Sequence, residues 1–108
     1  MSDLQRWSVK ETKDVLNDLE RYIRYLLFVK KNEQAADAVL SDYDDTIAEL
    51  EAVAGSLALM KNPRYAAKGY RVIRFKKHDY YLIYRVEGDV AVVYQMLHDL
   101  QDQEKSIR

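Results

Sequence analysis

The stretch that most constrains the fold runs from Tyr70 to His98, where hydrophobic, tyrosine-rich runs alternate with short polar breaks. The runs are 70–75, 80–86 and 90–98, and each is rich in the β-branched and aromatic residues that are typical of strands. Gly88 lies in the second break, where a tight hairpin needs a residue that accepts a positive φ. The pattern predicts a three-stranded antiparallel meander, and the rest of the chain must cover its apolar face.

Two amphipathic stretches precede the meander and predict a helical hairpin. In the first, apolar residues recur at helical spacing over 15–27, after the capping-box sequence Ser8-Val9-Lys10-Glu11, which predicts a helix start. In the second, apolar residues of 36–54 share one face, and Gly55 follows where a helix-ending glycine with positive φ is expected. The polar break at 30–33 predicts the turn between the two helices.

A small sheet and a helical hairpin with one apolar stripe bury each other, so the predicted fold is a two-layer α+β sandwich. We expect the alternating stretch from Leu4 to Ser8 to add an edge strand, giving the order β-α-α-β-β-β. The connector 56–69 then leads into the antiparallel sheet. Alternation turns Ile73 toward the helices and Arg74 toward the opposite face, which no third layer is expected to cover.

Length and composition narrow the class of protein. The 108 residues suffice for a single domain, 1–108, with one core. Because the chain has no cysteine and only two, well-separated histidines, we expect no disulfide, no metal site and no cofactor. The apolar runs are too short to span a membrane, and the N-terminus lacks a basic region followed by an apolar one. We therefore expect a cytoplasmic protein that does not bind membranes.

The formal net charge of -1 disfavours general nucleic-acid binding, so any such role needs a local patch. The stretch 61–77 is basic, and it is either a solvated face or a binding surface. Its cations are Lys61, Arg64, Lys68, Arg71, Arg74, Lys76 and Lys77. The acidic run 42–45 lies on the second predicted helix, where consecutive residues diverge around the axis, so we expect it to be solvated.

Segments spread over nearly the whole chain match, in order and length, the pattern of a known family. They are Trp7-Ser8, Val15-Leu16 with Leu19, Ile47-Ala48-Glu49-Leu50, Asn62-Pro63, Tyr70-Arg71-Val72, Tyr81-Leu82-Ile83-Tyr84-Arg85-Val86 and Tyr94-Gln95-Met96-Leu97-His98. Each motif is mostly apolar spacing, and their joint order carries the similarity. Together they resemble the RelE/ParE superfamily of bacterial toxins from type II toxin-antitoxin systems.

The resemblance implies a toxin that inhibits growth, in systems also linked to plasmid stabilisation. It implies a hetero-oligomer with a cognate antitoxin, whose tail wraps the exposed sheet edge and the helical hairpin. Members are either ribosome-dependent mRNA endonucleases of the RelE kind or proteins of the ParE kind that poison DNA gyrase. The target suggested by resemblance is thus either gyrase or mRNA on the ribosome.

Departures from the nuclease pattern favour gyrase. Family nucleases place an arginine on the middle strand of the meander, where this chain has Tyr81. Many members follow the final histidine with glycine and two arginines, whereas here His98 is followed by Asp99-Leu100-Gln101. We predict a ParE-like toxin directed at gyrase. A metal-independent mRNA endonuclease is the alternative, and a non-enzymatic interaction module on the same fold is a further one.

A metal-independent RNase needs a base, a fixed cation and an acid. If the chain is such an enzyme, the candidates are Arg74 as the cation, His98 as acid or base, and Tyr94 as proton donor or stacking platform. Each also has a structural interpretation, since strand-end histidines and sheet tyrosines are often satisfied by packing. We expect His78 to be solvated in its turn. The residues predicted to bind a partner or target are Arg71, Tyr81, Arg85 and Lys68.

Overall fold

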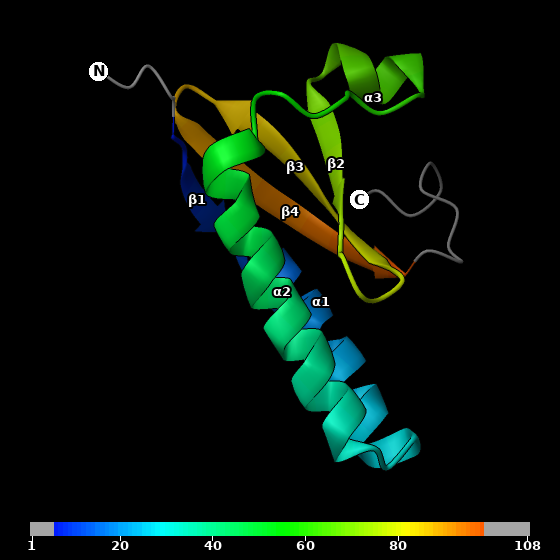
Figure 1. The fold of residues 1–108 in the computed structure, drawn as a ribbon. Helices are drawn as coiled ribbons and strands as arrows, with labels where there is room; N and C mark the ends of the chain where they lie inside the picture. The colour runs from blue at the N-terminus through cyan, green and yellow to red at the C-terminus, as the bar shows by residue number, and fades with distance from the viewer. Residues whose placement is uncertain (1–5, 99–108) are drawn as a thin grey trace.

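The computed structural model describes residues 6–98 as helices packed against a four-stranded sheet (Figure 1). The strands are β1 (Ser8–Glu11), β2 (Tyr70–Arg74), β3 (Tyr80–Glu87) and β4 (Val90–His98). The helices are α1 (Lys13–Arg24), the π-helical turn η1 (Tyr25–Val29), α2 (Glu33–Val53) and the short α3 (Pro63–Ala67). The predicted α+β architecture and the order β-α-α-β-β-β are confirmed, with α3 added in the connector. None of the helices in this range is long and apolar enough to cross a membrane.

The predicted meander is confirmed, because β3 pairs antiparallel with both β2 and β4. Gly88 turns the β3–β4 hairpin with a φ of 65°, as its place in the sequence predicts. A bulge follows Ile83, whose partner is Gln95, while Tyr84 pairs with Val93. Tyr94 is therefore the extra residue of β4, and the bulge sets the direction of its side chain.

The N-terminal strand differs from the prediction in position and direction. It comprises β1 at Ser8–Glu11 and pairs parallel with β4, so the sheet is mixed and has the order β1-β4-β3-β2. Of the predicted strand 4–8, residues 4 and 5 lie outside the described range. The capping box was wrong, because the N-cap of α1 is Thr12, whose hydroxyl accepts from Val15 N at 3.3 Å. The same hydroxyl donates to the Val93 carbonyl at 2.7 Å and ties the helix start to β4.

Helix α1 continues from β1 along the same edge of β4. The Asp18 carboxylate accepts from Met96 N at 3.0 Å, and the Tyr22 hydroxyl lies 3.2 Å from His98 N. Side chains thus satisfy backbone donors that a neighbouring strand would otherwise bind. Asp18 does not belong to the apolar stripe over 15–27, so helical spacing predicts that it faces solvent. This prediction was wrong, because Asp18 is only 1% exposed.

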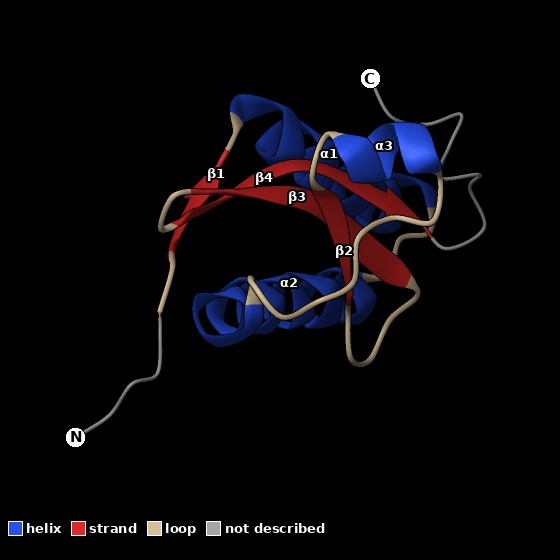
Figure 2. Cartoon of the chain, turned by 90° about the horizontal axis from the view of Figure 1, so that it is seen from above, coloured by secondary structure: helices blue, strands red, loops and turns tan. Residues whose placement is uncertain are grey.

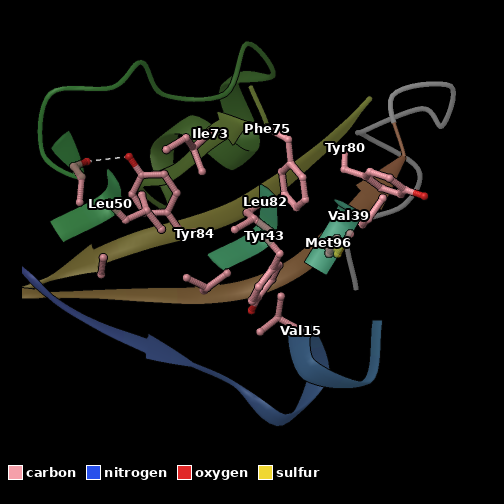
Figure 3. Close-up of a cluster of buried hydrophobic side chains, with 13 residues drawn as sticks. Val15, Val39, Tyr43, Leu50, Ile73, Phe75, Tyr80, Leu82, Tyr84 and Met96 are labelled. Carbon is pink, nitrogen blue, oxygen red and sulfur yellow. Dashed lines mark hydrogen bonds between the residues drawn. The ribbon is translucent and has the colours of Figure 1, made fainter. Parts of the chain in front are cut away.

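Helix α2 packs on one face of the sheet, while α3 lies on the other side (Figure 2). Tyr43 and Leu50 of α2 belong to the same buried cluster as Leu82 and Tyr84 of β3 (Figure 3). The Tyr84 hydroxyl donates to the Ala54 carbonyl at 2.7 Å, and burial raises the pKa of Tyr84 to about 12. The neutral hydroxyl therefore fastens the end of α2 to the middle of the sheet.

A second, smaller cluster lies on the opposite face, which the sequence predicts to be bare. Met60 of the connector is buried there with Tyr81, Ile83 and Leu97, and Tyr65 of α3 packs beside them. The connector therefore supplies a partial third layer, which leaves the remaining part of this face exposed.

Gly55 has a different role from the one predicted. It is not among the positive-φ residues, and α2 ends instead at Ala54 in the right-handed region. A Cβ at position 55 would lie 2.4 Å from Cζ2 of Trp7. The glycine therefore gives the Trp7 ring room to lie against the chain.

Asp42 was predicted to be solvated, and so was His78, but the two form a buried link between α2 and the β2–β3 turn. The Asp42 carboxylate, 2% exposed, lies 2.8 Å from His78 Nδ1 and accepts from Lys77 N at 2.9 Å. Burial acts to raise the pKa of Asp42, but these hydrogen bonds and the His78 charge outweigh it and hold the pKa below its usual range. Both predictions failed because each polar residue finds its partner far away in sequence.

Candidate functional site

The sheet face opposite α2 carries most of the predicted site residues. Strand alternation turns Arg74 to this face, and the ladder places it opposite Tyr81. The exposed Arg74 guanidinium lies 5.8 Å from the centroid of the buried Tyr81 ring. The predicted exposure of Arg74 beside a tyrosine is therefore confirmed.

Arg74 also borders a hollow at the outer edge of the sheet. The hollow has a volume of about 400 Å³ and lies where the connector passes β2. Its lining combines apolar side chains with two cations, and the residues are Ala58, Leu59, Met60, Lys61, Val72 and Arg74. Such a surface accepts an apolar group that carries a negative charge beside it.

Arg85 is held in a cluster near the other end of this face. Its guanidinium lies 5.5 Å from the ring centroids of both Tyr70 and Tyr94. It donates to Glu87 Oε2 at 2.8 and 3.1 Å, and the Tyr94 hydroxyl donates to the same oxygen at 2.6 Å. The bulge in β4 makes this geometry possible, because it brings Tyr94 to the side of Arg85.

The protonation states in this cluster are fixed by its hydrogen bonds. The bonds from Tyr94 and Arg85 lower the pKa of Glu87, so Glu87 is charged at neutral pH. The hydrogen bond from Tyr94 to Glu87, together with burial, raises the pKa of Tyr94. The hydrogen bonds from Arg85 to Glu87 raise the pKa of Arg85. The cluster therefore presents a fixed ion pair beside a neutral phenol, an arrangement suited to binding rather than to proton transfer.

His98 lies on the other face. It pairs with Tyr80 in the ladder, and its ring lies 5.1 Å from the Tyr80 ring, which belongs to the core beneath the helices. Tyr80 and Tyr81 are consecutive strand residues and point to opposite faces, so His98 and Arg74 do too. The structure does not bring these two candidate residues together.

Tyr94 shares a face with Arg74 but lies at a distance from it. The Tyr94 ring is 5.9 Å from that of Tyr70, which precedes Arg74 by four residues on β2. At the rise of a strand, this offset corresponds to roughly 13 Å. The three candidate catalytic residues thus occupy three separate places.

The predicted binding residues also lie in different parts of the fold. The Arg71 guanidinium donates to the Leu57 carbonyl and pairs in the ladder with Tyr84, so it helps to fix the connector on the helix side of the sheet. Lys68 is exposed and forms the C-cap of α3. Tyr81 and Arg85 lie on the face of Arg74.

The sequence interpretation missed Glu87 and Tyr70, which complete the Arg85 cluster. Glu87 was assigned to the turn beside Gly88, although period-2 alternation from Arg85 would have placed both side chains on one face. No three potential metal ligands among His, Asp and Glu gather anywhere in residues 6–98.

Comparisons with known proteins find similarity to proteins of toxin-antitoxin systems. The family described as the ParE toxin of the type II toxin-antitoxin system parDE matches residues 9–103. The structure is similar to a chain of the chromosomal ParDE system from P. aeruginosa, with a TM-score of 0.67 and 20% identity, covering 86% of this chain and 96% of that chain. It is also similar to a chain of the toxin-antitoxin complex RelBE2 from Mycobacterium tuberculosis, with a TM-score of 0.57, 14% identity and coverages of 91% and 97%. No curated protein sequence matches the chain.

Proposed function

Because the chain belongs to the ParE family of type II toxins, we propose that it arrests bacterial growth by inhibiting DNA gyrase and not by cleaving mRNA. Gyrase is a cytoplasmic enzyme, so the proposal places the toxin in the cytoplasm. The observation that carries the proposal is the separation of Arg74, His98 and Tyr94.

An RNase of this kind brings its base, cation and acid within hydrogen-bonding reach of one phosphate and its 2′-hydroxyl. Here Arg74 and His98 lie on opposite faces of the sheet, and Tyr94 is held by Glu87. This arrangement supports a toxin that acts by binding a protein.

We also propose that a cognate antitoxin docks along β2, which forms one outer edge of the sheet. Leu59 bridges to Arg71 at the start of β2, and among residues 6–98 no strand pairs with β2 on its outer side. An extended segment can add to such an edge, and the hollow beside Arg74 would hold an apolar side chain with an acidic neighbour. Both similar solved structures come from toxin-antitoxin systems, which supports a hetero-oligomer.

The test expresses the chain briefly in bacteria without its antitoxin and follows growth, plasmid supercoiling and new mRNA 5′ ends. We expect growth arrest with relaxed or broken plasmid and intact mRNA, equally for the wild type and Arg74→Ala. New 5′ ends within codons that vanish in Arg74→Ala would instead establish a nuclease, because removing a transition-state cation costs about 10²-fold or more in rate.

A further inference from the structure

The far end of the helical hairpin carries aromatic side chains covered by cations. Arg24 lies 5.2 Å from the Phe28 ring centroid, and Lys30 lies 5.8 Å from that of Tyr25. With Val29, these residues form a surface that we call the hairpin tip. Figure 1 shows this end of α1 and α2 projecting well beyond the sheet.

The rings of the hairpin tip lie on the π-helical turn η1. Lys30 N bonds the Tyr25 carbonyl at 3.0 Å, one residue further along than in an α-helix. On this turn, Tyr25 is 48%, Phe28 62% and Val29 64% exposed. The apolar spacing over 15–27 did not predict this surface.

A hollow of about 690 Å³ adjoins the tip and shares Tyr25 and Lys30 with it. Its other lining residues are Arg21, Tyr22, Leu26, Tyr80 and His98. Arg21 is paired with Asp18 at 3.3 Å and lies 5.4 Å from the Tyr22 ring centroid, and the Arg24 and Lys30 cations also lie over rings. The surface thus offers positive charge at the rim of an apolar hollow.

We propose that the hairpin tip is where the toxin contacts its protein target, through an acidic patch on that target with an apolar side chain that enters the hollow. The inference rests on the proposed function. Arginine beside exposed aromatic rings is the composition of binding hot spots between proteins. The phosphate backbone of a nucleic acid would leave Phe28 and Val29 without contacts. Binding to a membrane surface needs a long apolar helix face, whereas the tip is a single turn.

The experiment measures the affinity of purified toxin variants for purified DNA gyrase by calorimetry. Phe28→Ala removes the exposed ring, and Arg24→Glu reverses the rim charge. Leu16→Ala and Lys13→Glu make the matched changes at exposed positions near the other end of α1. We expect the tip variants to bind about tenfold or more weakly and the control variants to bind as the wild type does.

Wild-type affinity in both tip variants would overturn the inference and leave the gyrase proposal standing. If the wild type itself does not bind gyrase, the proposed function fails, and the growth assay then tests the inference about the tip. Tip variants that still arrest growth would overturn that inference. Tip variants that no longer arrest growth but bind the antitoxin normally would support the inference for another protein target.

Two further measurements separate other occupants of the tip. Tip variants that lose affinity for the antitoxin would assign the surface to that partner and overturn the inference. If the wild type binds phosphatidylglycerol vesicles and the tip variants do not, the tip would be a membrane-binding surface, and the inference would also be overturned. Equal melting temperatures are expected for all four variants, because every substituted side chain is exposed.

Discussion

The two faces of the sheet use tyrosines for different purposes. On the helix side, Tyr84 is fully buried and its hydroxyl is bound to a backbone carbonyl. On the other side, the rings of Tyr70 and Tyr94 contact each other, and each lies 5.5 Å from the Arg85 guanidinium near solvent. Polar groups on the first face fasten elements to one another, whereas those on the second lie at the surface.

The difference separates buried polar groups that stabilise the fold from charged groups at the surface. The carboxylates of Asp18 and Asp42 are buried and bind backbone N–H groups of elements far away in sequence. Exposed charges such as Arg74 contribute little to stability because water screens them. We expect substitutions on the helix side to change stability, and substitutions on the other face to change binding alone.

The largest effect is expected at Asp18. Removing its carboxylate in Asp18→Ala leaves the N–H of Met96, itself buried, without its acceptor and opens a small void. The free energy of unfolding should fall by about 3 kcal/mol. Urea denaturation measures this, with Asp18→Asn as the control, since its amide oxygen can still accept. A loss below about 0.5 kcal/mol in Asp18→Ala would break the distinction between the two faces.

A smaller effect, visible as a pH dependence, is expected at the link between Asp42 and His78. Asp42 has a lowered pKa in the folded state, so its contribution is complete above its ordinary value of 3.8 and is lost as the pH falls below it. At pH 7, His78→Ala should cost about 1–3 kcal/mol by removing a partner of the carboxylate. As the pH falls below 3.8, Asp42→Asn should therefore lose less stability than the wild type. Parallel curves would show that Asp42 titrates normally.

The smallest effect on stability is expected at Tyr94. Tyr94→Phe keeps the ring over Arg85 and removes only the hydroxyl that donates to the exposed Glu87. The free energy of unfolding should change by less than about 0.5 kcal/mol. Tyr84→Phe is the matched control, because it removes a buried hydroxyl of the same kind and should cost about 1 kcal/mol. Equal losses at the two positions would remove the contrast between the faces.

The sequence predicted what depends on local spacing. The meander, its Gly88 turn and the exposure of Arg74 follow from period-2 alternation and turn chemistry. The capping box at Ser8 failed because the same letters form a strand once β4 offers a parallel edge. Helix η1 left no signal, since its run of apolar residues fits an α-helix equally well.

Contacts between residues far apart in the chain could not be predicted. Nothing near Asp42 indicates that His78 lies 2.8 Å away, and nothing near Gly55 indicates the Trp7 ring. The candidate catalytic residues follow from their chemistry and from the family resemblance. Only the ladder shows that Arg74 and His98 point to opposite faces.

The most direct test of the proposed function is supercoiling of relaxed plasmid by purified gyrase in the presence of the purified chain. We predict that the wild type and Arg74→Ala inhibit supercoiling to the same extent, because the proposed function is inhibition by binding to a protein, without a catalytic role for Arg74. Full gyrase activity at a large molar excess of folded toxin would contradict the account and favour mRNA as the target.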